Sequence, residues 1–145
     1  MSVAVAHHTR SSSALALQEG ARQAAYRGTH LLVVHVVESL DNDIAEANKA
    51  GISDAVENAL EAACLPDLQW DVRLVPGGRD IADVSEAILA TVRELGPDLL
   101  VIGARRRSPM GKAFLGSVAQ NIILDADVPV LVVKSPRGGH EGVLT

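Results

Sequence analysis

The sequence predicts a single α/β domain built on an open, doubly wound sheet of five parallel strands. Short apolar runs rich in β-branched residues alternate with longer amphipathic segments, which is typical of repeated strand–helix units. The chain has 145 residues, enough for one hydrophobic core. It contains only one Phe, one Tyr and one Trp, so Ala, Val, Leu and Ile must fill the interior. That composition fits a parallel sheet covered by helices.

The apolar runs are the expected strands, and their patterns indicate where each lies in the sheet. The second and fourth runs are apolar on both faces, which favours central positions. The third run alternates between apolar and charged residues over much of its length, which favours an edge. The expected strands span residues 3–7, 30–38, 68–76, 98–103 and 128–134.

The segments between these runs are the expected helices, and capping residues mark several of their ends. Ser11 to Ser13 supply N-cap hydroxyls for the first helix, and Gly28 follows its end. Asp80 is placed to cap the third helix, which Gly96 and Pro97 terminate. The expected helices span residues 12–27, 42–63, 81–95 and 113–125. Right-handed crossovers through them give the doubly wound topology.

Charge and composition exclude several classes of protein. The net charge of −5 disfavours nonspecific binding to nucleic acid or to an anionic membrane. No apolar run approaches the roughly 20 residues that cross a bilayer, and no leader pattern is present. Cys64 is the only cysteine, so no internal disulfide can form, and we expect it to be a small buried residue. We expect a cytoplasmic domain over residues 1–135 and a flexible tail over residues 136–145.

The loop after the fourth strand combines glycines with cations in "GARRRSPMGKAFLGSVAQ". Gly116 and Ser117 lie where a helix is expected to begin and would present backbone N–H groups and a hydroxyl to an anion. The helix dipole adds a few tenths to about 1 kcal/mol for an anion there. The spacing matches neither a Walker A loop nor a Rossmann glycine triplet. In a doubly wound sheet, ligands bind outside the carboxyl ends of the strands, where this loop is expected.

On these residues the chain resembles the universal stress protein family. Its nucleotide-binding members carry Gly, two residues, Gly, nine residues, Gly, and then Ser or Thr. Gly103, Gly116 and Ser117 occupy three of those four positions, and Arg106 stands at the second glycine. The segments "HVVES" and "DADVPVLVVK" extend the resemblance over essentially the whole domain.

The resemblance implies a strand order of 3-2-1-4-5, a homodimer paired through the last strand (Val128 to Lys134) and, in one branch of the family, an ATP or AMP site. Binding members contact adenine through backbone at the end of the second strand, which corresponds to Val36 here. They also carry an Asp after the first strand, where this chain has His8 preceded by His7. The candidate nucleotide-binding residues are therefore Ala6, His7, His8, Val36, Gly103, Arg106, Gly116, Ser117 and Val118.

Arg106 and the two histidines leave several readings open. In the first, the arginines belong to a loop exposed to solvent and have no ligand. In the second, Arg106 blocks the position of the phosphate. In the third, its guanidinium binds the phosphate in place of the backbone N–H contacts that a glycine would allow. His7 and His8 either end a strand without a ligand or, when protonated, attract an anion such as phosphate or sulfate. His35 fits a structural place within the second strand.

The leading interpretation is a regulatory, non-catalytic universal stress protein whose modified cleft binds ATP or AMP weakly or not at all. The alternative is a genuine ATP or AMP sensor with slow ATP hydrolysis, in which Mg²⁺ enters only with ATP. A small phosphate-ester hydrolase or nucleotidyl transferase is a third possibility, but the strand ends offer no obvious metal-binding carboxylate. We identify no catalytic residues and no protein metal ligands from the sequence.

Overall fold

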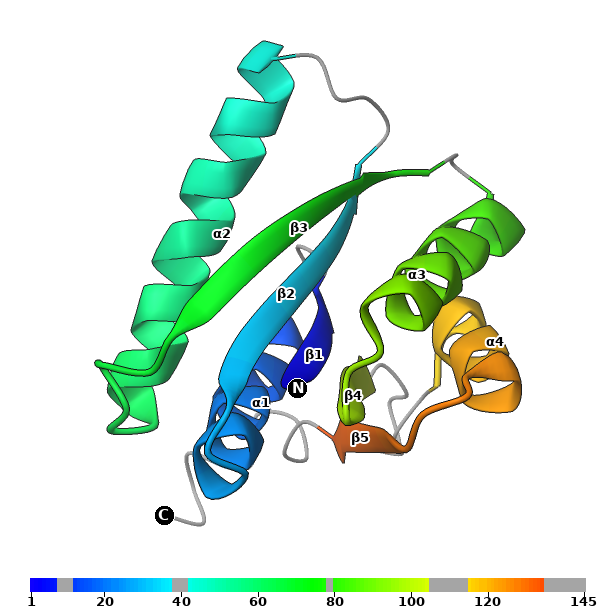
Figure 1. Ribbon diagram of the computed structural model, residues 1–145. Helices are drawn as coiled ribbons and strands as arrows, with labels where there is room; N and C mark the ends of the chain where they lie inside the picture. Colours follow the sequence, from blue (N-terminus) through cyan, green and yellow to red (C-terminus); the bar gives the residue numbers. More distant parts are fainter. Residues whose placement is uncertain (8–11, 38–41, 78–79, 105–114, 135–145) are drawn as a thin grey trace, which may run out of the picture.

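The computed structural model describes residues 1–7, 12–37, 42–77, 80–104 and 115–134. Its strands form one sheet in the order β3-β2-β1-β4-β5, in which every neighbouring pair is parallel (Figure 1). The strands are β1 (Ser2–His7), β2 (His30–Val37), β3 (Trp70–Pro76), β4 (Leu99–Ala104) and β5 (Val130–Lys134). The predicted fold class and strand order are confirmed, and β3 lies at an edge as its alternating pattern indicates.

Two helices cover each face of the sheet, as the doubly wound topology requires. Helices α1 (Ser12–Tyr26) and α2 (Asn42–Ala62) pack on one face, and α3 (Ile81–Leu95) and α4 (Ser117–Asp125) on the other (Figure 1). Alternate residues of each strand belong to two different apolar clusters. Val3 and Val5 face α1 and α2, while Ala4 faces α3 and α4. The core therefore lies in two layers, as the sequence composition predicts.

Helix α4 begins later than residue 113, where the sequence predicts its start. It begins at Ser117, after Gly116 in an extended conformation (φ −64°, ψ 161°), and the preceding residue, Leu115, is not helical. The first residues of the predicted span lie outside the described residues. The C-terminus of α3 follows the prediction, because Gly96 adopts the left-handed conformation (φ 56°) that ends the helix.

Gly20 permits close packing of α1 on β1. A Cβ atom at this buried position would overlap Cγ2 of Val5 and lie 3.2 Å from Cδ1 of Leu31. Val5 and Leu31 have no exposed surface, so neither can move aside into solvent. The short distance between helix and strand therefore depends on the missing side chain.

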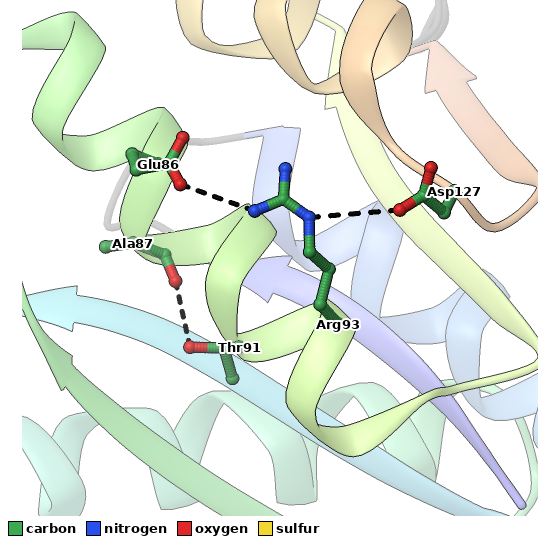
Figure 2. Close-up of polar contacts among 5 residues, drawn as sticks. All are labelled: Glu86, Ala87, Thr91, Arg93 and Asp127. Atoms are coloured by element: carbon green, nitrogen blue, oxygen red, sulfur yellow. Dashed lines mark hydrogen bonds and ion pairs between the residues drawn. The ribbon is translucent and has the colours of Figure 1, made fainter.

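Polar contacts connect α3 to α4 and to the segment before β5. The amide of Asn121 donates to the hydroxyl of Ser85 at 3.2 Å. Arg93 lies between Glu86, at 3.4 Å, and Asp127, at 3.8 Å (Figure 2). These ion pairs are largely exposed, and each stabilises the fold by at most about 1 kcal/mol. The buried Thr91 satisfies its hydroxyl within α3 by donating to the carbonyl oxygen of Ala87 at 2.9 Å (Figure 2).

The expectation that Cys64 is buried is wrong. Helix α2 ends at Ala62, and Cys64 follows in a turn with a left-handed backbone conformation (φ 60°) and an exposed side chain. Its amide donates to the carbonyl oxygen of Glu61 at 3.0 Å, which closes the turn. The conformation of this turn leaves the thiol exposed instead of placing it in the apolar interface.

Of the helices that the structure describes, none combines the length and apolar character needed to cross a membrane.

Candidate ligand site at the carboxyl edge of the sheet

The strand order reverses between β1 and β4. From β1 the chain proceeds to β2 and β3 on one side, and it then crosses to β4 and β5 on the other. All strands are parallel, so the carboxyl ends of β1, β2 and β4 meet at one edge of the sheet. Ligands of doubly wound sheets bind outside that edge, at the point of reversal.

The start of α4 provides the part of this edge best suited to an anion. Gly116 is the N-cap residue, and no side chain among the described residues caps the helix there. An added Cβ atom at Gly116 would meet no atom of the described residues within 4 Å, and the backbone angles are ones that any residue adopts. Neither packing against the described residues nor backbone conformation therefore requires a glycine here.

The next two residues of α4 differ in what they can offer a ligand. Ser117 is exposed, which leaves its hydroxyl accessible. Val118 directs its side chain into the core cluster beneath α3 and α4, so its backbone N–H is the group suited to a ligand. The first turn thus combines N–H groups, a hydroxyl and the positive end of the helix dipole.

Two histidines meet at the carboxyl ends of β1 and β2. His7 and His35 are partners in the strand register, and their Nδ1 atoms lie 3.1 Å apart. The Nδ1 atom of His35 also lies 3.0 Å from the carbonyl oxygen of His7. Because a carbonyl only accepts hydrogen bonds, His35 Nδ1 carries the proton and His7 Nδ1 accepts. The neutral form of His7 is therefore protonated on Nε2.

Burial lowers the pKa of His35 below 6.5, and the hydrogen bond to the His7 carbonyl opposes that shift in part. The side chain is 7% exposed. The prediction that His35 fills a structural place agrees with this burial. Its direct contact with His7 is a feature that the sequence reasoning missed.

The lowered pKa of His35 predicts a loss of stability on acidification. Below pH 6.5, the ordinary pKa of histidine, the unfolded chain binds more protons at this residue than the folded chain. The free energy of unfolding should therefore fall as the pH decreases from 6.5 to the lowered pKa, and this contribution should be constant below it. Urea unfolding at about pH 7.5 and about pH 5.5 measures the loss.

His35→Asn should lose less stability between these two pH values than the original protein. The control is His30→Asn, which changes an exposed histidine on the same strand and should retain the original pH dependence. An identical pH response of His35→Asn and the original protein would contradict the prediction.

The structure places most of the predicted site residues at the expected edge. Ala6 and His7 end β1, Val36 is the penultimate residue of β2, and Gly103 is the penultimate residue of β4. Gly116 is the N-cap of α4, and Ser117 and Val118 are its first two residues. His8 and Arg106 lie outside the described residues, so their predicted roles stay predictions.

A metal site with three or more protein ligands does not occur among the residues that the structure describes, counting His, Cys, Asp and Glu.

The sheet order, the reversal point and the open helix start define an α/β domain of the class that binds ligands at the carboxyl edge of a parallel sheet. The chain matches the model of the universal stress protein family over residues 1–134. It belongs to that family.

Individual relatives agree with this assignment. The chain is 35% identical over 123 residues to a universal stress protein of Mycolicibacterium smegmatis, a match that covers 85% of this chain and 88% of the relative. A solved universal stress protein of Archaeoglobus fulgidus is 27% identical, with a TM-score of 0.70, and the match covers 92% of this chain and 98% of that one. A structure from the same organism in complex with dAMP is 26% identical, with a TM-score of 0.67 and the same coverage.

Proposed function

We propose that this chain is a cytoplasmic, non-catalytic regulatory protein that binds an adenine nucleotide weakly at the carboxyl edge of its sheet. The observation that carries the proposal is Gly116. This glycine is the N-cap of α4, although neither its backbone conformation nor its packing against the described residues requires a glycine, and none of their side chains caps the helix start. A ligand that needs close backbone approach accounts for a glycine at such a position.

The related Archaeoglobus fulgidus protein solved with dAMP supports an adenine nucleotide as the ligand. Val36 is suited to a backbone contact with the base, because its side chain packs on the α3 and α4 face. Gly103 and Ser117 retain positions of the motif that the nucleotide-binding members of the family carry. ATP would bring Mg²⁺ as its counter-ion, whereas AMP needs none.

Weak binding follows from the two motif positions that differ. Arg106 replaces a glycine, and a side chain there costs both space and any conformation with positive φ. His8 replaces an aspartate that the binding members carry. Retention of Gly103, Gly116 and Ser117 favours the second candidate, a tight ATP or AMP sensor with slow hydrolysis.

Calorimetric titration with ATP and AMP, with and without Mg²⁺, distinguishes these functions. We expect weak binding that Gly116→Ala reduces further, because the added methyl group occupies the open helix start. Gly51→Ala is the matched control: Gly51 lies within α2, where an added Cβ also meets nothing within 4 Å. Tight stoichiometric ATP binding by the original protein would replace the weak-binding proposal with the sensor. Equal nucleotide affinities of Gly116→Ala and Gly51→Ala would show that Gly116 has no role in binding.

We also propose that the protein is a homodimer paired through β5. This strand lies at an edge of the sheet with β4 as its partner, and Val130 to Val133 are only partly buried. Unpaired edge strands promote association, and a two-fold copy would pair the edge. Leu124 of α4 is 80% exposed, which adds apolar surface shortly before β5. Sedimentation equilibrium at increasing concentration tests the proposal, and a monomer at every concentration would contradict it.

A further inference from the structure

Strand β3 lies at one edge of the sheet, with β2 as its partner among the strands that the structure describes (Figure 1). The amide of Leu31 in β2 donates to the carbonyl oxygen of Gln69, and the amide of Gly77 donates to the carbonyl oxygen of Val37 in β2, each at 3.0 Å. Along a strand, successive residues direct their backbone groups to opposite sides. The odd-numbered residues of β3 therefore bond to β2, and the even-numbered residues direct their N–H groups to the outer edge.

The outer edge of β3 offers fewer hydrogen-bond donors than a strand of its length normally would. Pro76 has no backbone N–H. The N–H of Val72 donates to Oδ1 of its neighbour Asp71 at 2.8 Å. Trp70 and Leu74, on either side of Val72, keep N–H groups that point outward. The carboxylate of Asp71 thus occupies the place in the middle of the edge where the carbonyl oxygen of an added strand would have to lie.

Asp71 is well suited to this position. Its side chain is exposed, whereas Trp70, Val72 and Leu74 pack against the core cluster beneath α1 and α2. A carboxylate is a stronger acceptor than a neutral carbonyl oxygen, so a backbone carbonyl does not readily displace it. An added strand would also remove water from the charge, which is unfavourable without a new partner. We propose that Asp71 closes the edge of β3 to strand pairing, so that no second copy of this chain can extend the sheet there.

A closed edge at β3 limits the size of any assembly built by strand pairing. A sheet that is open at both edges can add copies at both ends and form an open-ended chain of molecules. With β3 closed, β5 is the edge of the described sheet that is left for pairing, and association through it stops at two copies. The role of Asp71 does not depend on whether β5 forms the proposed dimer.

The test is sedimentation velocity of three variants and the original protein at increasing concentration. Asp71→Ala removes the acceptor and should form larger assemblies than the original protein at the same concentration, with association through β3 roughly tenfold tighter, the equivalent of one hydrogen bond. Asp71→Asn keeps an Oδ1 acceptor without the charge and should sediment like the original protein. Asp67→Ala removes the same charge from an exposed position before β3 and should also sediment like the original protein.

The proposal is overturned if Asp71→Ala sediments like the original protein or if Asp67→Ala forms equally large assemblies. Large assemblies of Asp71→Asn would also overturn it, because charge repulsion rather than the hydrogen bond would then keep the copies apart.

Amide hydrogen exchange gives a second readout that does not require association. At a concentration too low for association, the N–H of Val72 should exchange roughly tenfold more slowly in the original protein and in Asp71→Asn than in Asp71→Ala. Exchange of Val72 in the original protein at the rate of an unfolded chain would overturn the proposal even if Asp71→Ala failed to fold.

Discussion

Replacing Gly20 by Ala is expected to lower the free energy of unfolding by about 1–3 kcal/mol, the usual cost of overpacking a core. The added methyl group would overlap Cγ2 of Val5 and approach Cδ1 of Leu31 at 3.2 Å. Val5 is β-branched and fully buried, so α1 must shift away from β1 to accommodate the change. The helix propensity of alanine offsets only about 1 kcal/mol of this cost.

Gly51→Ala is the matched control for this prediction. The chemical change is the same and also lies within a helix, but the position is exposed and an added Cβ meets nothing within 4 Å. We expect the free energy of unfolding to rise by about 0.5–1 kcal/mol, because alanine loses less backbone entropy than glycine. Urea unfolding measures both changes. A Gly20→Ala variant as stable as the original protein would show that α1 does not depend on this close approach.

Replacing Arg106 by Gly is expected to raise the affinity for AMP and ATP roughly tenfold, equivalent to regaining about one hydrogen bond. Arg106 is the one arginine of the cluster that occupies a glycine position of the nucleotide motif. Its replacement restores the motif and frees the space of a long side chain. Calorimetric titration of the variant with each nucleotide measures the change.

Arg107→Gly is the control for this prediction, because it removes the same charge from a position outside the motif. Its affinity should stay near that of the original protein or fall slightly. A loss of affinity in Arg106→Gly alone would mean that this arginine is the phosphate ligand. Equal losses in both variants would indicate that the loop attracts the nucleotide through its summed charge.

Hydrophobic patterning predicted the positions of three strands well, because the faces that each of them buries are encoded in its own sequence. β2 and β4 are apolar on both faces and lie inside the sheet, whereas β3 alternates and lies at its edge. The end of α3 was equally predictable from Gly96, since this residue adopts the left-handed conformation that other residues avoid. The strand order itself came from the family resemblance.

The candidate site was only partly predictable. The motif glycines located the edge of the sheet, but no local signal joins His7 to His35, which lie 28 residues apart in the chain. Their contact follows only from the register of β1 with β2, which could be examined once the two strands were paired. The error at Cys64 has a different origin: the helix was expected to end at residue 63, and composition does not reveal that the turn after it exposes the thiol.

Gly77 has a consequence for how this family can diversify. A Cβ atom there would lie 2.6 Å from Cγ1 of Val36 and 3.3 Å from Cβ of Ala87, so folding alone selects against any larger residue. At Gly116, by contrast, a Cβ atom would contact none of the residues that the structure describes. In descendants of this chain that lose nucleotide binding, we therefore expect Gly116 to be replaced by other residues and Gly77 to be retained.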